Sequence, residues 1–419
     1  MKITILAIGT QGDVRPLIAL GKGLHVAGHE VGIATYGFYE TLVRQDGLEF
    51  FLVQFDILEA LKSKAGQATM ESSDNSVRSL LNFAKVIGPS MAQIGDDFLA
   101  ACQNTDAIIC SSFACHFGPN IAKKLNVPFI DAFLQPVHPT CAFANFLSPL
   151  VLHRHKFGGL VNKVTHVLGD ALLWFPYRSV INQWCQERLN LPPLSFKQFR
   201  LQQRPALCAV SPNVVPRPLD WNKDIEMTGY WFIDEASDWQ PPAGLVAFLE
   251  AGSPPISVGF GSMGTSEQLI TIVLEALART KQRGLLLTGW GGLSLSDLPD
   301  NVFKIESVPH DWLFPRMAAV IHHGGAGTTA AGLRAGIPSI LIPFMMDQPF
   351  WGQRVIDVGV GPQPILRKKL SVERLVAAIT TAITDKDMHK RAALLGQRIQ
   401  AEEGVARAVE IINRRFSNR

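Results

Sequence analysis

The chain has 419 residues, more than one hydrophobic core usually serves, so we expect two domains. Hydrophobic residues make up 47% and charged residues 18%, which excludes a disordered chain, and a net charge of +3 gives no case for a nucleic-acid partner. No apolar run reaches the roughly 18 residues that cross a bilayer, and residues 1–8 are too short for a secretion signal. The six cysteines form no CxxC pair, so we expect a cytoplasmic protein with reduced, buried thiols.

In the first half, short apolar strands alternate with amphipathic helical stretches. One such stretch is 15–27, where Leu17, Leu20 and Leu24 recur at helical spacing. The predicted strands are 2–8, 30–35, 106–111, 127–131 and 207–211. The alternation restarts after Trp239-Gln-Pro-Pro, with strands predicted at 256–260, 285–288, 302–306, 318–322 and 339–342.

This alternation predicts an α/β fold with two doubly wound, Rossmann-like domains that face each other across a cleft. We expect a first domain at 1–233 with a variable insertion at about 140–204, and a linker at 234–250. A second domain would follow at 251–396. The helix at 397–419 would then pack back on the N-terminal domain.

The segment 150–204 interrupts the alternation and is basic, with eight Lys or Arg against two acidic residues. Aromatic residues are interleaved with these charges. One interpretation is a solvated helical insertion whose aromatics belong to the core. The other is an apolar acceptor pocket with a basic rim that can rest on anionic lipid at the inner face of the membrane.

The most informative segment is 308–329. A predicted strand ends at His322 and is followed by a glycine-rich loop, after which Thr328 and Thr329 begin a helix. Glycines let the backbone approach a ligand closely, and free amides at a helix start favour phosphate oxygens. His323 and the Thr328 hydroxyl can each donate a hydrogen bond to a diphosphate. The string is neither a P-loop nor a dinucleotide fingerprint, and a tight turn with a core histidine is the competing interpretation.

Three motifs carry a resemblance to a known family: Pro309-His-Asp-Trp-Leu-Phe, His322-His-Gly-Gly-Ala-Gly-Thr-Thr and Asp347-Gln-Pro-Phe-Trp-Gly. They resemble the donor-binding signature of inverting glycosyltransferases of the GT-B fold, most of all the sterol glucosyltransferases and next the antibiotic transferases. The resemblance covers essentially the whole chain, and it implies that the domain at 1–233 is acceptor-binding and that the domain at 251–396 is nucleotide-sugar-binding. It is specific in the second half and at 9–16, and weak from 48 to 201.

The resemblance implies how a nucleotide-sugar donor is held. The backbone of Val308 would read the edge of the base. Plant members stack the base on a tryptophan where this chain has Ser307, so we expect Trp290, beside a glycine turn, to supply the stacking face. Ser262, in a second glycine-rich turn, would contact phosphate or ribose. The complete donor-binding set is Gly12, Ser262, Trp290, Val308, His323, Gly325, Ala326, Gly327, Thr328, Asp347 and Gln348.

Asp347 and Gln348 match the acidic–Gln pair that holds the hydroxyls of the transferred sugar in this family. One side chain accepts hydrogen bonds and the other both donates and accepts, which suits a polyhydroxylated ligand. Taken alone, Asp347 could equally cap the helix before Pro349.

The N-terminal loop Gly9-Thr-Gln-Gly-Asp-Val-Arg-Pro carries the catalytic candidate, Asp13. Sterol and antibiotic members place an aspartate in this turn, where it would accept the proton of the acceptor hydroxyl. By sequence alone Asp13 could equally cap a helix that starts near Pro16, and the resemblance favours catalysis. For acceptor contacts we can name only the region 140–204, with His116 and His138 as further candidates.

The string Asp385-Lys-Asp387 spells DxD, by which other glycosyltransferases hold a divalent ion. It lies far in sequence from every glycine loop, so we expect a solvated helix start there instead. The helix amides of the phosphate loop make a metal unnecessary, and we expect no metal ligands and no cofactor.

The leading hypothesis is an inverting transfer of a hexose, with UDP-glucose the expected donor, onto an apolar alcohol such as a sterol, hopanoid, terpenoid or macrolide. A dTDP-sugar-dependent antibiotic transferase is one alternative, and a nucleotide-sugar epimerase on the same fold is another. The epimerase would not need the insertion at 140–204. A non-catalytic sugar-nucleotide sensor is disfavoured by the presence of Asp13, His323, Asp347 and Gln348.

Overall fold

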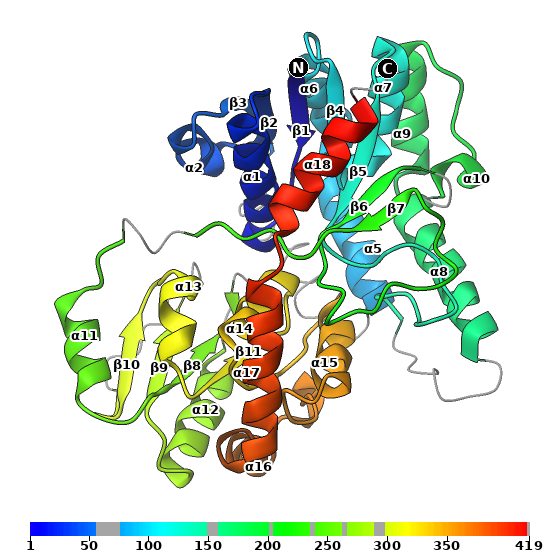
Figure 1. Cartoon of the computed structure of the whole chain (residues 1–419). Helices are drawn as coiled ribbons and strands as arrows, with labels where there is room; N and C mark the ends of the chain where they lie inside the picture. The colour runs from blue at the N-terminus through cyan, green and yellow to red at the C-terminus, as the bar shows by residue number, and fades with distance from the viewer. Residues whose placement is uncertain are drawn as a thin grey trace. The chain divides into compact units, whose positions relative to one another are not determined.

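The computed structural model describes residues 1–55, 76–148, 158–200, 204–234, 239–261, 266–288 and 298–416. The chain forms two compact units, one of Met1–Ile233 with Glu402–Arg419 and the other of Asp234–Ala401 (Figure 1). The second unit therefore includes residues 234–250, which we had assigned to a linker, and helix α11 (Ala243–Glu250) packs Leu245 into its core. Among the described helices, none is long and apolar enough to span a membrane.

The first unit is built on a seven-stranded parallel sheet. Its spatial order is β3-β2-β1-β4-β5-β6-β7. The strands are β1 (Lys2–Leu6), β2 (Glu30–Tyr36), β3 (Glu49–Val53), β4 (Ala107–Ser111), β5 (Phe129–Phe133), β6 (Ala206–Cys208) and β7 (Ile225–Met227). The five predicted strands of this half are all present, with ends that differ by one to three residues.

Strands β3 and β7 were not predicted, and they are the two edges of the sheet. An edge strand is paired on one side only, so its sequence need not be a continuous apolar run. The partial exposure of β3, in which only Val53 is buried, and the three-residue length of β7 fit this position.

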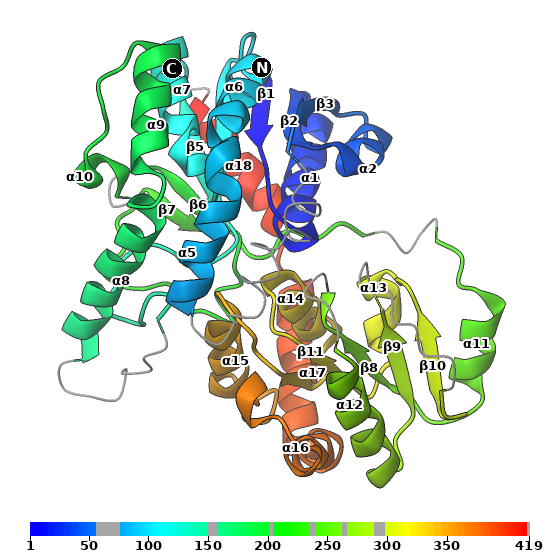
Figure 2. The ribbon, with the colours of Figure 1, turned by 180° about the vertical axis from the view of Figure 1, so that it is seen from behind.

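Helices cover both faces of this sheet. Connections between parallel strands are right-handed, so the chain that runs from β1 to β2 and the chain that runs back from β3 to β4 cross opposite faces of the sheet. Accordingly α1 and α18 lie toward the viewer in Figure 1, and α5 and α6 lie toward the viewer in Figure 2. The helices of this unit are α1 (Gln11–Val26), α2 (Glu40–Gln45), α5 (Ser76–Ile87), α6 (Met91–Ala101), α7 (Gly118–Leu125), α8 (Gly158–Trp174), α9 (Arg178–Trp184), α10 (Phe196–Phe199) and α18 (Gly404–Phe416).

The second unit holds a five-stranded parallel sheet in the order β10-β9-β8-β11-β12. The strands are β8 (Ile256–Gly259), β9 (Gly284–Leu287), β10 (Val302–Ile305), β11 (Ala319–His322) and β12 (Ser339–Leu341), all of which were predicted to within one residue. Besides α11, its helices are α12 (Glu267–Arg279), α13 (His310–Leu313), α14 (Ala326–Ala335), α15 (Gln348–Asp357), α16 (Val372–Thr384) and α17 (Lys386–Gln400).

Each sheet has one point at which the strand order reverses. In the first unit it lies between β1 and β4, and in the second between β8 and β11. At such a point neighbouring connections depart to opposite faces and leave a crevice outside the carboxyl ends of the strands, where ligands of open α/β sheets bind. The loops after β1, β8 and β11 are the three glycine-rich segments that carry Asp13, Gly261 and His323.

All six cysteines are free, and five are buried as expected. Cys141 is exposed, which corrects our expectation for that residue.

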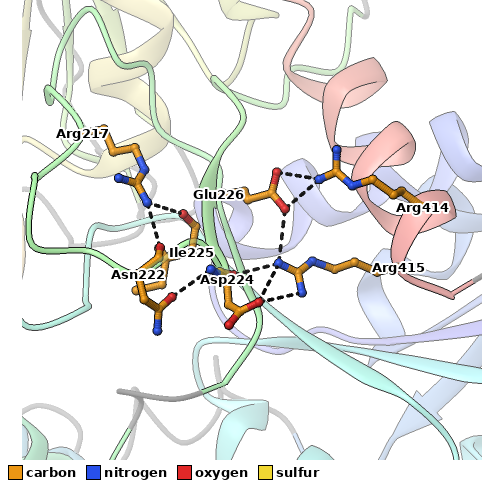
Figure 3. A network of polar contacts seen from close by, with 7 residues as sticks. All are labelled: Arg217, Asn222, Asp224, Ile225, Glu226, Arg414 and Arg415. Atoms are coloured by element: carbon orange, nitrogen blue, oxygen red, sulfur yellow. Dashed lines mark hydrogen bonds and ion pairs between the residues drawn. The ribbon is translucent and has the colours of Figure 1, made fainter. Parts of the chain in front are cut away.

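The C-terminal helix α18 is held on the first unit by apolar and ionic contacts. Ile411 and Ile412 are buried in the core of that unit. Arg414 donates to both carboxylate oxygens of Glu226 at 2.9 and 2.8 Å, and Arg415 contacts Asp224 at 3.2 Å (Figure 3). Because Asp224 and Glu226 lie at edge strand β7, these pairs join the end of the chain to the edge of the sheet.

We predict that Glu226→Ala weakens the docking of α18. Glu226 accepts from Arg414 at both carboxylate oxygens and its side chain is only 18% exposed, so the loss of this pair should cost about 1 kcal/mol, the upper part of the range for surface ion pairs. Hydrogen exchange of the amides of α18 should therefore accelerate by up to about fivefold, measured by mass spectrometry. As a control, Glu275→Ala removes an exposed pair with Arg279 on α12 and should leave exchange in α18 unchanged. Unchanged exchange in both variants would show that Glu226 does not help to hold the helix.

Candidate active site

His323 is the first residue after β11, and two glycines make room for its ring. A Cβ on Gly325 would lie 2.7 Å from the Nε2 atom of His323, and one on Gly261 would lie 3.1 Å from its Cε1 atom. Gly324 has φ +92°, a conformation that other residues rarely adopt. The loops after β8 and β11 therefore meet at the His323 ring, as their positions on neighbouring strands require.

The two adjacent histidines have different roles. His322 is buried, and its Nδ1 accepts a hydrogen bond from the Gly324 amide at 3.0 Å, which holds the loop in place. Burial lowers the pKa of His323 to about 4. At neutral pH His323 is thus uncharged, so it can donate an N–H to a phosphate but cannot supply a positive charge. Its Nδ1 is buried and has no hydrogen-bond partner among the residues that the structure describes.

Helix α14 begins directly after this loop, with Gly325 as its N-cap. The amides of Ala326, Gly327 and Thr328 occupy its first turn, where helical geometry provides no acceptor for them. All three residues are only partly buried. The predicted phosphate cradle therefore consists of three helix-terminal amides, supported by the helix dipole, beside the N–H of His323.

Asp347 and Gln348 lie in a tight turn after β12. Met346 adopts φ +55°, a strained conformation for a residue with a side chain. The Oε1 atom of Gln348 accepts from the amides of Phe344 at 2.7 Å and Met345 at 3.0 Å, and the residue is buried. Gln348 therefore holds the turn with its oxygen, a structural role that its sequence position did not reveal.

Asp347 accepts a hydrogen bond at Oδ2 from the indole Nε1 of Trp351, at 2.8 Å. Trp351 is fully buried and lies one turn along α15. Our sequence analysis missed this residue, although the spacing of four residues on a helix that begins beside Asp347 was visible in the motif.

Of three further donor-binding candidates, only Val308 lies among the described residues. The Val308 side chain is buried in the second unit, which leaves its backbone as the part that could read a base. Ser262 and Trp290 lie outside the described residues, although Gly261, which precedes Ser262, contacts His323 as given above.

In the first unit, α1 begins at Gln11 rather than near Pro16, so Asp13 lies in its first turn. The Oδ2 atom of Asp13 accepts from the amide of Thr10 at 2.8 Å and from its hydroxyl at 2.9 Å. Burial raises the pKa of the Asp13 carboxyl above its ordinary value of 3.8, while the two bonds from Thr10 act in the opposite direction. The capping role and the catalytic role are therefore compatible, because the cap uses one carboxylate oxygen.

Two features near Asp13 were not foreseen. Pro16 has no N–H, so the Gly12 carbonyl lacks its usual helical donor. The Tyr39 hydroxyl is buried and has no hydrogen-bond partner among the described residues, and burial together with the Asp13 carboxylate raises the pKa of the phenol.

The two histidines named as acceptor candidates lie in the interior. His116 contacts the carbonyl oxygens of Phe113 and Leu173 at 3.0 and 3.1 Å through its two ring nitrogens. His138 is fully buried against Phe133 and Trp221, and burial lowers its pKa to about 3. Both side chains pack in the core, so neither presents its ring at an open surface.

The insertion at about 140–204 is largely helical from 158 to 199 and irregular at 140–148 and 190–195, and most of its aromatics are core, as the first interpretation held. Trp174, Tyr177 and Trp184 are at most 2% exposed. Several basic side chains are paired rather than arranged as a free rim, namely Lys163 with Asp220, Arg188 with Asp96, Arg200 with Asp170 and Arg204 with Asp131. Helix α8 nevertheless exposes Leu160, Val164 and Leu168, which recur every four residues and so form one apolar stripe.

Asp385 of the DxD string is the N-cap of α17. Its Oδ1 atom accepts from the amides of Asp387 and Met388, both at 2.9 Å, and these bonds lower the pKa of the carboxyl. This is the helix start that we expected. In the described part of the chain, no three His, Cys, Asp or Glu residues gather as metal ligands would.

The folds of known proteins match this architecture over the whole chain. The glycosyltransferase of kitacinnamycin aligns with a TM-score of 0.71 at 19% identity, covering 99% of each chain. Glycosyltransferase VinC, solved in complex with dTDP, aligns with a TM-score of 0.70 at 16% identity over all of both chains. Two doubly wound parallel sheets, matched over the whole chain by these solved structures, thus define the GT-B glycosyltransferase fold.

Family models match each half of the chain. Residues 3–144 match the glycosyltransferase family 28 N-terminal domain, and residues 287–412 match the erythromycin biosynthesis protein CIII-like C-terminal domain. Sterol 3-beta-glucosyltransferases UGT80A2 and UGT80B1 of Arabidopsis thaliana are 38% and 35% identical over 98% and 99% of this chain. The chain belongs to the glycosyltransferase family that contains the sterol 3-beta-glucosyltransferases.

The curated relatives are longer than this chain. The chain spans 65% and 68% of the two Arabidopsis proteins. It spans 30% of the sterol 3-beta-glucosyltransferase of Aspergillus terreus, to which it is 37% identical.

We predict that Gln348→Ala loosens the turn that presents Asp347. The amides of Phe344 and Met345 would lose a buried acceptor, at a cost of about 1–3 kcal/mol. The melting temperature of the second unit should fall by several degrees, and exchange of these two amides should accelerate. Gln348→Glu keeps an oxygen in place and serves as the control, which should retain slow exchange at both amides. Wild-type exchange at both amides in the alanine variant would contradict this role for Gln348.

Proposed function

We propose that the protein is an inverting glycosyltransferase that transfers glucose from UDP-glucose to the hydroxyl of a sterol-like apolar alcohol. The arrangement of the second unit carries this proposal. His323 and the first turn of α14 present neutral N–H donors at the carboxyl end of β11, and the Asp347 turn follows β12, the neighbouring strand. The resemblance of both motifs to sterol glucosyltransferases supports the choice of sugar and acceptor, and the relatives do not favour the epimerase.

In the proposed reaction, Asp13 accepts the proton of the acceptor hydroxyl as the oxygen bonds to the anomeric carbon. The bond from that carbon to the diphosphate oxygen breaks in the same step, and UDP leaves with the electron pair. His323 and the amides of Ala326, Gly327 and Thr328 would stabilise the charge that develops on the diphosphate. A carboxylate is a weak base for an alcohol, so proton transfer would be late, when the hydroxyl has become more acidic.

The region 140–204 remains our proposal for the acceptor contact. The exposed stripe of Leu160, Val164 and Leu168 on α8 supports an apolar partner. Contact with a membrane surface and a cytoplasmic location remain predictions of the sequence.

The decisive experiment is a screen of nucleotide sugars against apolar alcohols, with products identified by mass spectrometry. UDP-glucose with a sterol should give a β-linked glucoside, since a single displacement inverts the anomeric centre. Conversion of the donor to another sugar nucleotide without any acceptor would instead indicate an epimerase. Donor binding with no product on any acceptor would indicate a sensor.

We predict that Asp13→Asn abolishes transfer while the affinity for UDP changes little. The amide keeps an oxygen for the Thr10 bonds but cannot accept the proton of the acceptor. General-base catalysis typically contributes 10²–10⁴-fold, so kcat should fall by about that factor, measured in single turnovers. In the wild type, kcat/KM should decrease as the pH is lowered through the pKa of Asp13, because the base must be ionised. Burial raises this pKa above the ordinary value of 3.8, so the decrease should occur at a higher pH than for an exposed aspartate. Loss of UDP affinity with unaltered single-turnover chemistry would reduce Asp13 to a helix cap.

We also predict that transfer persists in excess EDTA. The proposed diphosphate ligands are amides and a neutral imidazole, so the reaction would not depend on a bound cation. Initial rates with and without chelator, and after addition of Mg²⁺ or Mn²⁺, should agree within about twofold. A strict requirement for either ion would overturn the proposed phosphate cradle.

A further inference from the structure

Trp351 donates two hydrogen bonds to Asp347, and one of them reaches the carboxylate. Its indole Nε1 donates to the Oδ2 atom of Asp347 at 2.8 Å, and its backbone amide donates to the Asp347 carbonyl at 3.1 Å. An indole N–H can only donate, so this bond is formed with the carboxylate as acceptor. A hydrogen bond to a charged acceptor is stronger than one between neutral groups.

The indole is held firmly by its surroundings. Trp351 has no exposed surface, and Phe350 lies edge-on to it at a centroid distance of 5.2 Å. The next residue is Gly352, where a Cβ would come within 3.1 Å of Pro364. Because the indole cannot turn away without disrupting this packing, its N–H constrains the orientation of the carboxylate.

The backbone that carries Asp347 is constrained separately. The strained Met346 precedes it, and Gln348 closes the turn by accepting from two amides. The turn therefore determines where the Cα atom of Asp347 lies, while Trp351 determines the direction of its carboxylate. A carboxylate has several acceptor positions, so the bond from Trp351 leaves capacity for a ligand hydroxyl.

We infer that Trp351 is a positioning residue for the donor sugar. Its indole N–H orients Asp347 so that the carboxylate can accept hydrogen bonds from hexose hydroxyls. This inference rests on the proposed function, since it assigns Trp351 to the sugar-holding part of that site. A ligand held by a misdirected carboxylate would lose orientation as well as affinity, so the effect should extend to the rate of transfer.

The test is Trp351→Phe, which keeps an aromatic ring and removes the N–H. The kcat/KM for UDP-glucose should fall roughly tenfold or more, the scale of a lost hydrogen bond to a charged group. The affinity for UDP, measured by calorimetry, should stay within about twofold, because UDP lacks the hexose. Trp239→Phe is the matched control, since this tryptophan packs against Trp312 in the same unit and should leave both quantities unchanged.

A double-mutant cycle separates positioning from a general loss of packing. If Trp351 acts through Asp347, the double variant Trp351→Phe/Asp347→Ala should be no slower than Asp347→Ala alone. The inference would be overturned if the decreases in kcat/KM of the two single variants multiplied in the double variant. It would also be overturned if Trp351→Phe lowered the affinity for UDP as much as it lowered kcat/KM. If the phenylalanine variant does not fold, benzothienylalanine at position 351 retains the bicyclic shape, removes only the N–H, and should show the same loss.

The two hypotheses fail in different ways. If the wild-type protein transfers no glucose, the proposed function fails. The double-mutant cycle is then based on binding, and the quantity compared among the variants is the difference in affinity between UDP-sugars and UDP. In that case Trp351→Phe and Asp347→Ala should reduce this difference by the same factor, and a difference unaffected by Trp351→Phe would reject the role of Trp351. If the wild type transfers glucose and Trp351→Phe is fully active, only the inference fails.

Discussion

The site depends on the parallel arrangement of the strands in each sheet. Every strand of a parallel sheet ends at the same edge, so the loops that follow them gather there. Where the strand order reverses, the connecting helices leave for opposite faces and open a crevice. The loops after β8 and β11 lie at this point of the second unit, and the loop after β1 lies at the corresponding point of the first. If β8 and β11 were not neighbours in the sheet, Gly261 would be separated from the His323 ring.

At the His323 loop and the start of α14, the groups that could meet a phosphate are N–H dipoles rather than charged side chains. Burial lowers the pKa of His323 to about 4, so at neutral pH its ring contributes an N–H. The first-turn amides of α14 contribute fixed partial positive charges, as the N–H of His323 does. Such donors are held by the fold before a ligand arrives, so they need no reorganisation when negative charge develops on a leaving group.

Several residues here serve the fold and the site together. Asp13 accepts from Thr10 and so stabilises the start of α1, and Gln348 closes the turn that carries Asp347. Sequence patterns treat a cap and a catalytic group as competing explanations. In the structure the capping bond does not exclude the proposed role, because a carboxylate or an amide has more acceptor and donor positions than one bond occupies.

The sequence by itself determined the fold class, every interior strand and the glycine-rich loops, because buried parallel strands require continuous apolar runs and close loops require glycine. It also pointed to His323, the α14 amides and Asp347 through motifs that are local along the chain. The tertiary structure alone decided what depends on contacts between distant segments. The edge strands β3 and β7 exist by pairing with β2 and β6, and their sequences lack the signature of a strand buried on both faces. His116 and His138 looked like site residues because histidine is versatile, but packing against Phe113, Phe133 and Trp221 places them in the interior. The tertiary structure also decided the orientation of the Asp347 carboxylate. The hydrogen bond from Trp351 requires helix α15, which places the indole beside Asp347, and the burial that prevents the indole from turning.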